Sequence, residues 1–379
     1  MRSTSLCFML FSTLLAGSVL AENQSTSLQQ AYSPYFSIGT ALSERQIRDQ
    51  EPGTLDLVKQ QFNVLTAENV MKWEAIEPVE GQFNFAAADA MIEFAEANNI
   101  KVIGHVLLWH EQTPAWVFQD AKGQPASKEL VLSRLKNHIN AVMGRYKGRI
   151  QGWDAVNEAL NEDGTLRQSN WYKALGEDYI ATVFELAHQA DPKAELYYND
   201  FNLFKPEKRD GVLKLVAALK AKNVPIHGIG EQGHYSLDYP ELQQVEDSIV
   251  AFGKTGLPVM ITELDISVLP FPDPENIGAD ISLNMKLKQE FNPYAAGLSK
   301  AVSDQLSNKY LQLFELFLRH SDIVQRVTLW GVNDNQTWRN DWPMKGRTDY
   351  PLLFDRKNQP KEVVPQLIEL AQSADKTKK

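Results

Sequence analysis

The chain has 379 residues, enough for two domains or one large α/β barrel, and an ordinary globular composition with 43% hydrophobic and 23% charged residues. Its net charge is −10, and its basic residues form no run beyond the short tail of Lys376, Lys378 and Lys379. This argues against nucleic-acid binding, which needs clustered cations. The single cysteine, Cys7, excludes a disulfide framework and a cysteine-based zinc site.

The first 21 residues have the pattern of a secretory signal peptide. Arg2 precedes an apolar stretch over residues 6–20, and Val19-Leu20-Ala21 is a small-residue cleavage signal. The stretch is too short and too early for a membrane-spanning helix, and the alternative is a buried N-terminal helix. We therefore expect residues 1–21 to be removed, leaving a secreted or periplasmic protein without membrane attachment.

Residues 22–379 contain no repeat or linker that would divide them, so we expect one domain. Short apolar segments alternate with segments of helical spacing, such as residues 180–187 and 310–317. This alternation predicts an α/β fold, a (β/α)8 TIM barrel; a doubly wound sheet remains the rival, because periodicity does not show closure. The expected strands are residues 36–40, 63–67, 101–107, 152–156, 195–198, 228–232, 259–262 and 327–330.

Polar and aromatic residues follow nearly every expected strand. In a barrel, the carboxyl ends of the strands meet at one mouth, where catalytic groups usually lie. A structural sheet would place turn residues such as Gly, Asn, Asp and Pro there, which is why the barrel is preferred. The clusters are Glu68-Asn69, His105 with Trp109-His110, Asn157-Glu158, Asn199-Asp200, Gln232 with His234, Glu263, and Trp330.

Two glutamates end apolar strands. Glu158 ends the run Trp-Asp-Ala-Val-Asn-Glu, and Glu263 ends the run Val-Met-Ile-Thr-Glu. On the fourth and seventh strands their carboxyl groups would face each other across the mouth. Glycoside hydrolysis needs such a pair, one to protonate the leaving oxygen and one to attack or to activate water. A lone glutamate would more often be a solvated strand end or a salt-bridge partner, but two in matching positions favour catalysis.

The motifs around these strands resemble glycoside hydrolase family 10, in the order and spacing of that family over residues 35–370. The resemblance implies a (β/α)8 barrel, retaining chemistry, and an endo-β-1,4-xylanase whose partner is xylan or xylo-oligosaccharide substrate. The motifs are Glu-Asn-Val-Met-Lys-Trp (68–73), Gly-His-Val-Leu-Leu-Trp-His (104–110), Trp-Asp-Ala-Val-Asn-Glu-Ala (153–159), Ile-Thr-Glu-Leu-Asp-Ile (261–266) and Leu-Trp-Gly-Val (329–332).

The resemblance assigns the catalytic and substrate-binding roles known in the family to the residues of this chain that match its motifs. The resemblance makes Glu158 the acid/base and Glu263 the nucleophile. It gives Asn157 the hydrogen bond to the sugar 2-OH, and it makes His234, with Gln232 beside it, the residue that holds the nucleophile. The residues that resemble the glycone subsites are Glu68, Asn69, Lys72, His105 and Trp109, with Trp330 and Trp338 as the aromatic roof.

Some positions depart from the family or serve other purposes. Phe201 stands where Tyr is common, and Glu231 and Gly233 flank Gln232 where apolar and Ser residues are usual, which affects fine specificity rather than activity. The 264–326 connection contains four prolines and should be largely irregular before the last helices. Helical histidines are expected to be structural: His138, His188 and His320.

Four other functions remain to be weighed. Residues 228–233 spell the Gly-x-Gly-x-x-Gly of a dinucleotide-binding oxidoreductase, but residues 234–240 read as a loop instead of the required helix. A zinc hydrolase is disfavoured because the candidate histidine ligands in this sequence do not have the spacing of a metal site, so we expect no metal and no cofactor. A non-catalytic glycan-binding protein would need neither Glu158 nor Glu263. A cellulase or mannanase on the same barrel is the strongest competitor. We expect a monomer. The candidate zinc ligands are His105, His110, His227 and His234.

Overall fold

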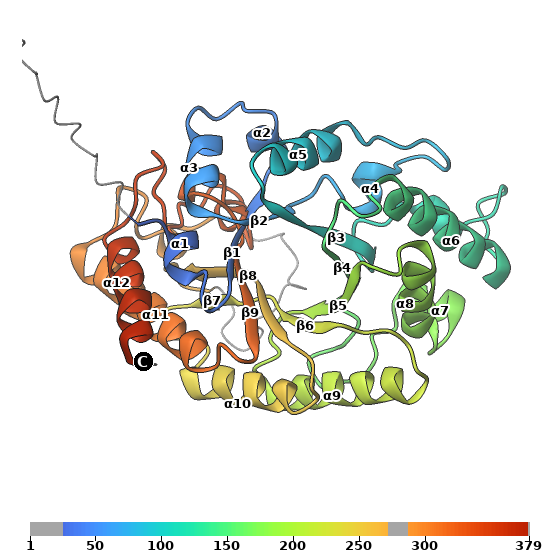
Figure 1. Cartoon of the computed structure of the whole chain (residues 1–379). Coiled ribbons are helices and arrows are strands. Elements are labelled where there is room, and N and C mark those ends of the chain that lie inside the picture. Colours follow the sequence, from blue (N-terminus) through green and yellow to red (C-terminus); the bar gives the residue numbers. More distant parts are fainter. Residues whose placement is uncertain (1–25, 272–286, 378–379) are drawn as a thin grey trace, which may run out of the picture.

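The computed structural model describes residues 26–271 and 287–377. The signal peptide expected at residues 1–21 lies outside this part of the chain. Within it, eight strands form a closed, entirely parallel barrel with helices around it (Figure 1). They are β1 (Ser37–Leu42), β2 (Val64–Ala67), β3 (Lys101–Trp109), β4 (Gly152–Asn157), β5 (Glu195–Asp200), β6 (Gly228–Glu231), β8 (Val259–Ser267) and β9 (Val324–Leu329).

Closure of the sheet decides between the two predicted folds. Each barrel strand pairs with its neighbour in chain order, β6 pairs with β8, and β9 returns to β1 through the register of Ile38 with Val327. The (β/α)8 barrel is therefore confirmed, and the doubly wound sheet is wrong. All eight expected strands are present, with boundaries that differ by a few residues.

The helices surround the barrel because each presents one apolar face to it. In α8, residues Ile180, Val183, Phe184 and Ala187 are all buried, as their spacing predicts. Serine side chains begin the longest helices: Ser127 caps α6 and Ser299 caps α11. The helices are α1 (Leu28–Tyr32), α2 (Glu44–Ile47), α3 (Thr54–Gln61), α4 (Trp73–Ile76), α5 (Ala86–Ala97), α6 (Lys128–Arg145), α7 (Asn170–Leu175), α8 (Tyr179–Ala190), α9 (Pro206–Ala221), α10 (Leu242–Gly253), α11 (Lys300–Arg319) and α12 (Val363–Thr377).

The barrel strands are buried on both faces, by the interior on one side and the helices on the other, so their sequences are nearly continuous apolar runs. On the outer face of the barrel, toward the helices, the indole of Trp153 occupies the space beside Gly104. A Cβ at Gly104 would lie 2.1 Å from Trp153 Cε3, so only glycine is accommodated there. Inside the barrel, a separate cluster comprises Val64, Ile103, Tyr197 and Met260. The lumen is a packed core that supports the mouth.

The prediction of a loop at residues 234–240 is partly wrong. Its first residues form a short strand, β7 (His234–Ser236), which pairs in parallel with residues 265–267 of β8. β8 continues to Ser267, five residues beyond its expected end at Thr262, and its last three residues are the ones that pair with β7. A strand of three residues is too short for the alternation of its side chains to be recognised in the sequence. The 264–326 connection is correspondingly shorter than expected, and residues 272–286 of it lie outside the described part.

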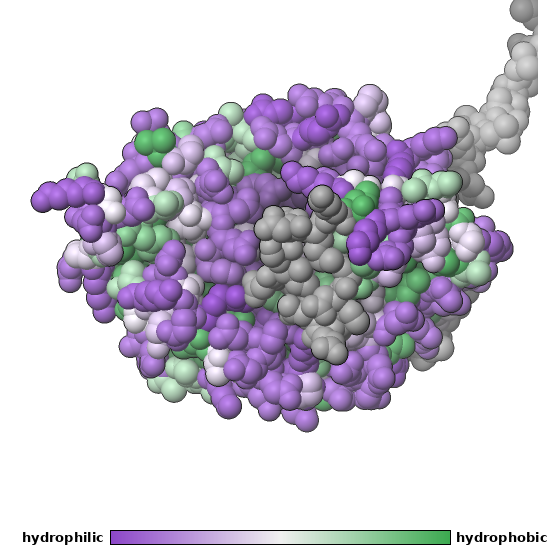
Figure 2. Space-filling model, turned by 180° about the vertical axis from the view of Figure 1, so that it is seen from behind, coloured by the Kyte–Doolittle hydropathy of each residue, from purple (hydrophilic) through white to green (hydrophobic). Residues whose placement is uncertain are grey.

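Hydrophilic residues predominate on the face shown in Figure 2, and hydrophobic ones appear there in small separate groups. In the part of the chain that the structure describes, no helix is long and apolar enough to cross a membrane.

Candidate active site

The predicted site residues lie at the carboxyl ends of the barrel strands. A network of contacts connects them, so they form one site. Glu68 and Asn69 follow β2, Lys72 precedes α4, His105 and Trp109 are in β3, Asn157 and Glu158 lie at the end of β4, Gln232 follows β6, His234 begins β7, Glu263 is in β8, Trp330 follows β9, and Trp338 begins the 3-10 helix η4 (Trp338–Asn340).

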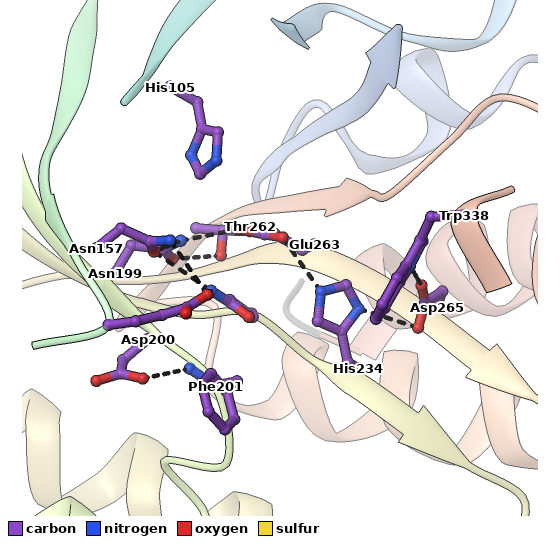
Figure 3. Close-up of polar contacts among 12 residues, drawn as sticks. His105, Asn157, Asn199, Asp200, Phe201, His234, Thr262, Glu263, Asp265 and Trp338 are labelled. Atoms are coloured by element: carbon purple, nitrogen blue, oxygen red, sulfur yellow. Dashed lines mark hydrogen bonds and ion pairs between the residues drawn. The ribbon is translucent and has the colours of Figure 1, made fainter. Parts of the chain in front are cut away.

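Two asparagine side chains connect the two glutamates. Asn199 Nδ2, at the end of β5, donates at 2.9 Å both to Glu263 Oε1 and to Asn157 Oδ1. Asn157 Nδ2 donates at 3.1 Å to Glu158 Oε1. Thr262 donates to Asn199 Oδ1 at 2.6 Å and so fixes the orientation of that amide (Figure 3). The carboxylates of Glu158 and Glu263 are thus held on one rigid hydrogen-bonded chain.

Glu263 is held in its ionised form. It is 5% exposed, and burial by itself would raise its pKa. The hydrogen bond from His234 Nε2 at 3.1 Å, the nearby His105 and the bond from Asn199 outweigh burial and lower the pKa of Glu263 below its ordinary value. A buried carboxylate that stays negative near neutral pH can attack an electrophilic carbon.

His234 is a cation between two carboxylates. Its Nε2 faces Glu263 and its Nδ1 lies 3.1 Å from Asp265 Oδ1. Burial opposes the charge, but Asp265 and Glu263 raise the pKa of His234 to about 9. Asp265 is fully buried and also accepts hydrogen bonds from Arg339 at 2.8 Å and from Trp338 Nε1 at 2.7 Å. Despite burial, Arg339 and His234 lower the pKa of Asp265 to about 2.

Glu158 has different surroundings. Its Oε2 accepts Trp109 Nε1 at 2.8 Å, and its Oε1 accepts Gln232 Nε2 at 2.9 Å together with the Asn157 amide. These three donors are uncharged. The backbone of Glu158 has φ 57°, the left-handed region, which costs a residue with a Cβ about 1–3 kcal/mol.

Lys72 is a buried cation beside both glutamates. Its Nζ lies 3.0 Å from Asn69 Oδ1 and 4.8 Å from the centre of the Trp109 ring. Burial lowers the pKa of Lys72, although Glu263, Glu68 and Glu158 oppose this shift by their charges. These residues place an ammonium group and an amide where sugar hydroxyl groups could be bound.

His105 and the tryptophans complete the mouth. His105 Nδ1 is 2.9 Å from Asp154, and the His105 ring contacts the edge of Trp330 at 5.4 Å between centroids. Trp338 packs on His234 at 4.8 Å. Trp330 and Trp338 therefore both contact the imidazoles that neighbour Glu263.

A cavity of about 400 Å³ lies on the Glu263 side of the mouth, where His234, a hydrogen-bond partner of Glu263, and Trp338 belong to its lining. Most of the remaining wall is aromatic or aliphatic, including Phe201, Leu269 and Trp342. Phe201, the departure from the family pattern, thus faces the cavity without a hydroxyl group. Glu231, another departure, is buried at the end of β6, where it lines a small space together with apolar residues of α10.

Sequence reasoning assigned no role to Asn199 and Asp265. In the sequence, Asn199 is one of two polar residues at the end of an expected strand. Asp265 lies two residues after Glu263, so both side chains project from the same face of β8, and this period of two was the available signal. Outside the mouth, His138 pairs with Glu77 and His320 with Glu246. Among the described residues, no group of three or more His, Cys, Asp or Glu side chains could hold a metal ion.

A closed parallel barrel with two bridged carboxylates, amides and tryptophans at its mouth has the architecture of a glycoside hydrolase. Within that class, the chain belongs to glycosyl hydrolase family 10, whose sequence profile matches residues 27–370. The resemblance seen in the sequence motifs is thereby confirmed.

Similar proteins support this assignment. The chain is 44% identical over 357 residues to the endo-1,4-beta-xylanase A of Xylanibacter ruminicola, covering 94% of this chain and 96% of that protein. It is 42% identical to a beta-1,4-xylanase of Dictyoglomus thermophilum over 90% of both chains. Among solved structures, a family 10 endoxylanase retrieved from a sugarcane soil metagenome aligns with a TM-score of 0.87 and 41% identity, covering 92% of this chain and all of that one.

Proposed function

We propose that this protein is a retaining endo-β-1,4-xylanase, with Glu158 as general acid/base and Glu263 as nucleophile. The observation that carries the proposal is the pair of carboxylates joined through Asn157 and Asn199 but placed in unlike surroundings. Retaining glycosidases keep their two carboxyl groups about 5–5.5 Å apart, closer than inverting enzymes do. Each carboxyl group binds its own amide, Glu158 that of Asn157 and Glu263 that of Asn199, so the retaining arrangement is inferred from membership of family 10.

The reaction proceeds in two displacements. In the first, Glu158 gives its proton to the glycosidic oxygen while Glu263 attacks the anomeric carbon, so the C–O bond to the leaving sugar breaks and a glycosyl ester forms. In the second, Glu158 takes a proton from water, the water oxygen attacks the same carbon, and Glu263 leaves as a carboxylate. The His234 cation stabilises Glu263 as the free carboxylate at both ends of this cycle.

The substrate class rests on the relatives and on the mouth. The two relatives above are named xylanases, and a further solved structure, 34% identical with a TM-score of 0.81, is a mutant in complex with xylotriose. Xylose lacks the C5 hydroxymethyl group of glucose, so Trp330 and Trp338 can close on it. The overlap of a larger sugar would cost about 1–3 kcal/mol, or roughly 10–200-fold in specificity.

The mechanism is tested with Glu263→Gln and Glu158→Ala. Glu263→Gln should nearly abolish xylan hydrolysis, because an amide is a poor nucleophile. Glu158→Ala should impair substrates with poor leaving groups far more than activated aryl xylobiosides, which scarcely need protonation. NMR of the first-formed product should show retention of the anomeric configuration; inversion would overturn the proposed role of Glu263.

Glu231→Gln is the matched control. Burial raises the pKa of Glu231 to about 8, so this carboxyl is neutral at pH 7, and the substitution preserves both its charge and its shape. Activity close to that of the unchanged protein is expected. The substrate is tested by comparing kcat/KM on xylan, carboxymethyl cellulose and mannan; a preference for cellulose or mannan would replace the xylanase assignment by that of the competing glycanase.

Export and oligomeric state belong to the same proposal. Residues 1–21 act as a cleaved signal peptide, and the mature enzyme is a monomer outside the cytoplasm. N-terminal sequencing of protein from the periplasm and the medium should find a start near Glu22. Light scattering should give the mass of a single chain, and an uncleaved N-terminus or a dimer mass would refute the respective part.

A further inference from the structure

The backbone conformation of Glu158 decides where its carboxyl group lies. Consecutive side chains of a strand point to opposite faces, so a Glu158 that merely continued β4 would point away from Asn157. In the structure, the two neighbouring side chains meet in a hydrogen bond of 3.1 Å. The positive φ of 57° at Glu158 is what turns the second side chain into the mouth. Since side chains disfavour this region, other contacts must maintain it.

The polar groups on both sides of Glu158 are held by other elements. Its N–H donates to Asn199 O at 2.9 Å, and its carbonyl accepts Arg167 Nε at 3.1 Å. The next N–H, that of Ala159, donates to the hydroxyl of Tyr198 at 3.2 Å, and Arg167 N–H donates to Ala159 O at 2.8 Å. Side-chain groups of Tyr198 and Arg167 therefore fix the peptide units that flank the turn.

The Tyr198 hydroxyl cannot easily turn away. Tyr198 is fully buried, and its hydroxyl donates to Asp200 Oδ2 at 2.6 Å, which leaves its lone pairs for the N–H of Ala159. Asp200 is in turn held by the buried Lys208 at 2.9 Å. Lys208 Nζ also lies 3.1 Å from Glu162, in the same loop that carries Ala159 and Arg167. An internal ionic network thus stands behind the hydroxyl.

We propose that Tyr198 and Arg167 are positioning residues that keep Glu158 in its left-handed conformation and thereby place its carboxyl group for proton transfer. The inference rests on the acid/base role proposed above for Glu158. Tyr198 acts through the N–H of Ala159 and Arg167 through the carbonyl of Glu158. Both control the acid through its backbone.

Loss of either contact has a specific consequence. The backbone at Glu158 can then relax toward negative φ, which withdraws the carboxyl group from the glycosidic oxygen. A displacement of about 1 Å can lower a rate by roughly 10²-fold. The loss should appear only where protonation of the leaving group limits the rate, while Glu263 keeps its own partners and its ability to attack.

The test measures kcat/KM for a series of aryl β-xylobiosides whose leaving groups range from dinitrophenol to phenol. For Tyr198→Phe and Arg167→Gln, we expect a loss of about 10–100-fold with the phenyl substrate and less than about 3-fold with the dinitrophenyl substrate, since general acid catalysis contributes about 10²–10⁴-fold. Tyr32→Phe is the matched control, because it also removes a buried hydroxyl, one that donates to Leu367 O at 2.9 Å between α1 and α12. It should leave the series unchanged.

Introducing Tyr198→Phe into Glu158→Ala provides the decisive comparison. If Tyr198 acts through Glu158, the second substitution adds no further dependence on the leaving group. Equal losses across the series, no loss in either single variant, or fully additive losses would overturn the inference. If Tyr198→Phe does not fold, Arg167→Gln gives the same reading. A Glu158→Ala enzyme without leaving-group dependence would instead refute the proposed function itself.

Discussion

His234→Asn should destabilise the protein in a pH-dependent way, because His234 is a cation held between Glu263 and Asp265. The folded protein raises the pKa of this imidazole from 6.5 to about 9. At about 1.36 kcal/mol per pKa unit, this corresponds to about 3 kcal/mol of stability. This free energy belongs to His234, Glu263 and Asp265 together, since the same attraction lowers the pKa of both carboxyl groups.

The sign of the pH dependence follows from the raised pKa. The stabilisation is fully present below pH 6.5, where His234 would be protonated in both the folded and the unfolded chain, and it is lost as the pH rises toward 9. Urea unfolding followed by tryptophan fluorescence should therefore show His234→Asn about 3 kcal/mol less stable at about pH 6 and nearly equal to the unchanged protein at about pH 9.5.

His320→Asn is the control for removal of a histidine hydrogen bond, because His320 contacts Glu246 at 2.7 Å outside the barrel mouth. The His234 effect is read as the excess over this variant at each pH. A difference between His234→Asn and the unchanged protein that stays constant from about pH 6 to about pH 9.5, or that grows with pH, would show that the imidazole is not a cation in the folded state.

Three further outcomes are expected. Gly164→Ala should lower the unfolding free energy by about 1–3 kcal/mol more than Gly81→Ala. Both glycines have φ 76°, but a Cβ at Gly164 would lie 2.3 Å from a carbonyl oxygen of α9, whereas a Cβ at Gly81 would meet open space. Equal losses of unfolding free energy in denaturation would contradict this. Trp338→Phe removes the N–H that Asp265 accepts at 2.7 Å, so kcat/KM on xylo-oligosaccharides should fall about 10-fold or more, and an unchanged value would remove Trp338 from the site. Burial lowers the pKa of His138 below 6.5, so in mild acid the unfolded chain binds a proton that the folded chain does not. The unfolding free energy should therefore decline as the pH falls below 6.5, and His138→Asn should flatten this decline. An unaltered slope in acid for His138→Asn would refute this role of His138.

The barrel strands could be predicted because a strand buried on both faces must be a short apolar run. Their ends were less predictable. β8 extends to Ser267 because β7 pairs with it above the rim, and β7 is a strand only because that partner is present. Neither segment has a local pattern that separates it from a loop, since the pairing joins residues about 30 positions apart.

The site could be predicted where the type and position of a single residue indicate a catalytic role. Glu158 and Glu263 end apolar strands, and motif resemblance added their neighbours. The roles of Asn199 and Asp265 needed the structure, because an asparagine or aspartate at a strand end is also an ordinary turn residue. The left-handed backbone of Glu158 was equally hidden, since nothing in a glutamate favours that conformation.

By itself, the sequence determined the class of fold, the family and the residue types at the mouth, because these depend on local patterns: apolar runs, helical spacing and motifs. Only the tertiary structure decided closure of the sheet through β6 and β8, the protonation of His234, and the direction of the Glu158 side chain. The physical reason is that each of these depends on groups that are distant in the chain and meet only when the barrel closes. A charge or a backbone angle is stabilised by its neighbours in space, and these are a property of the folded molecule.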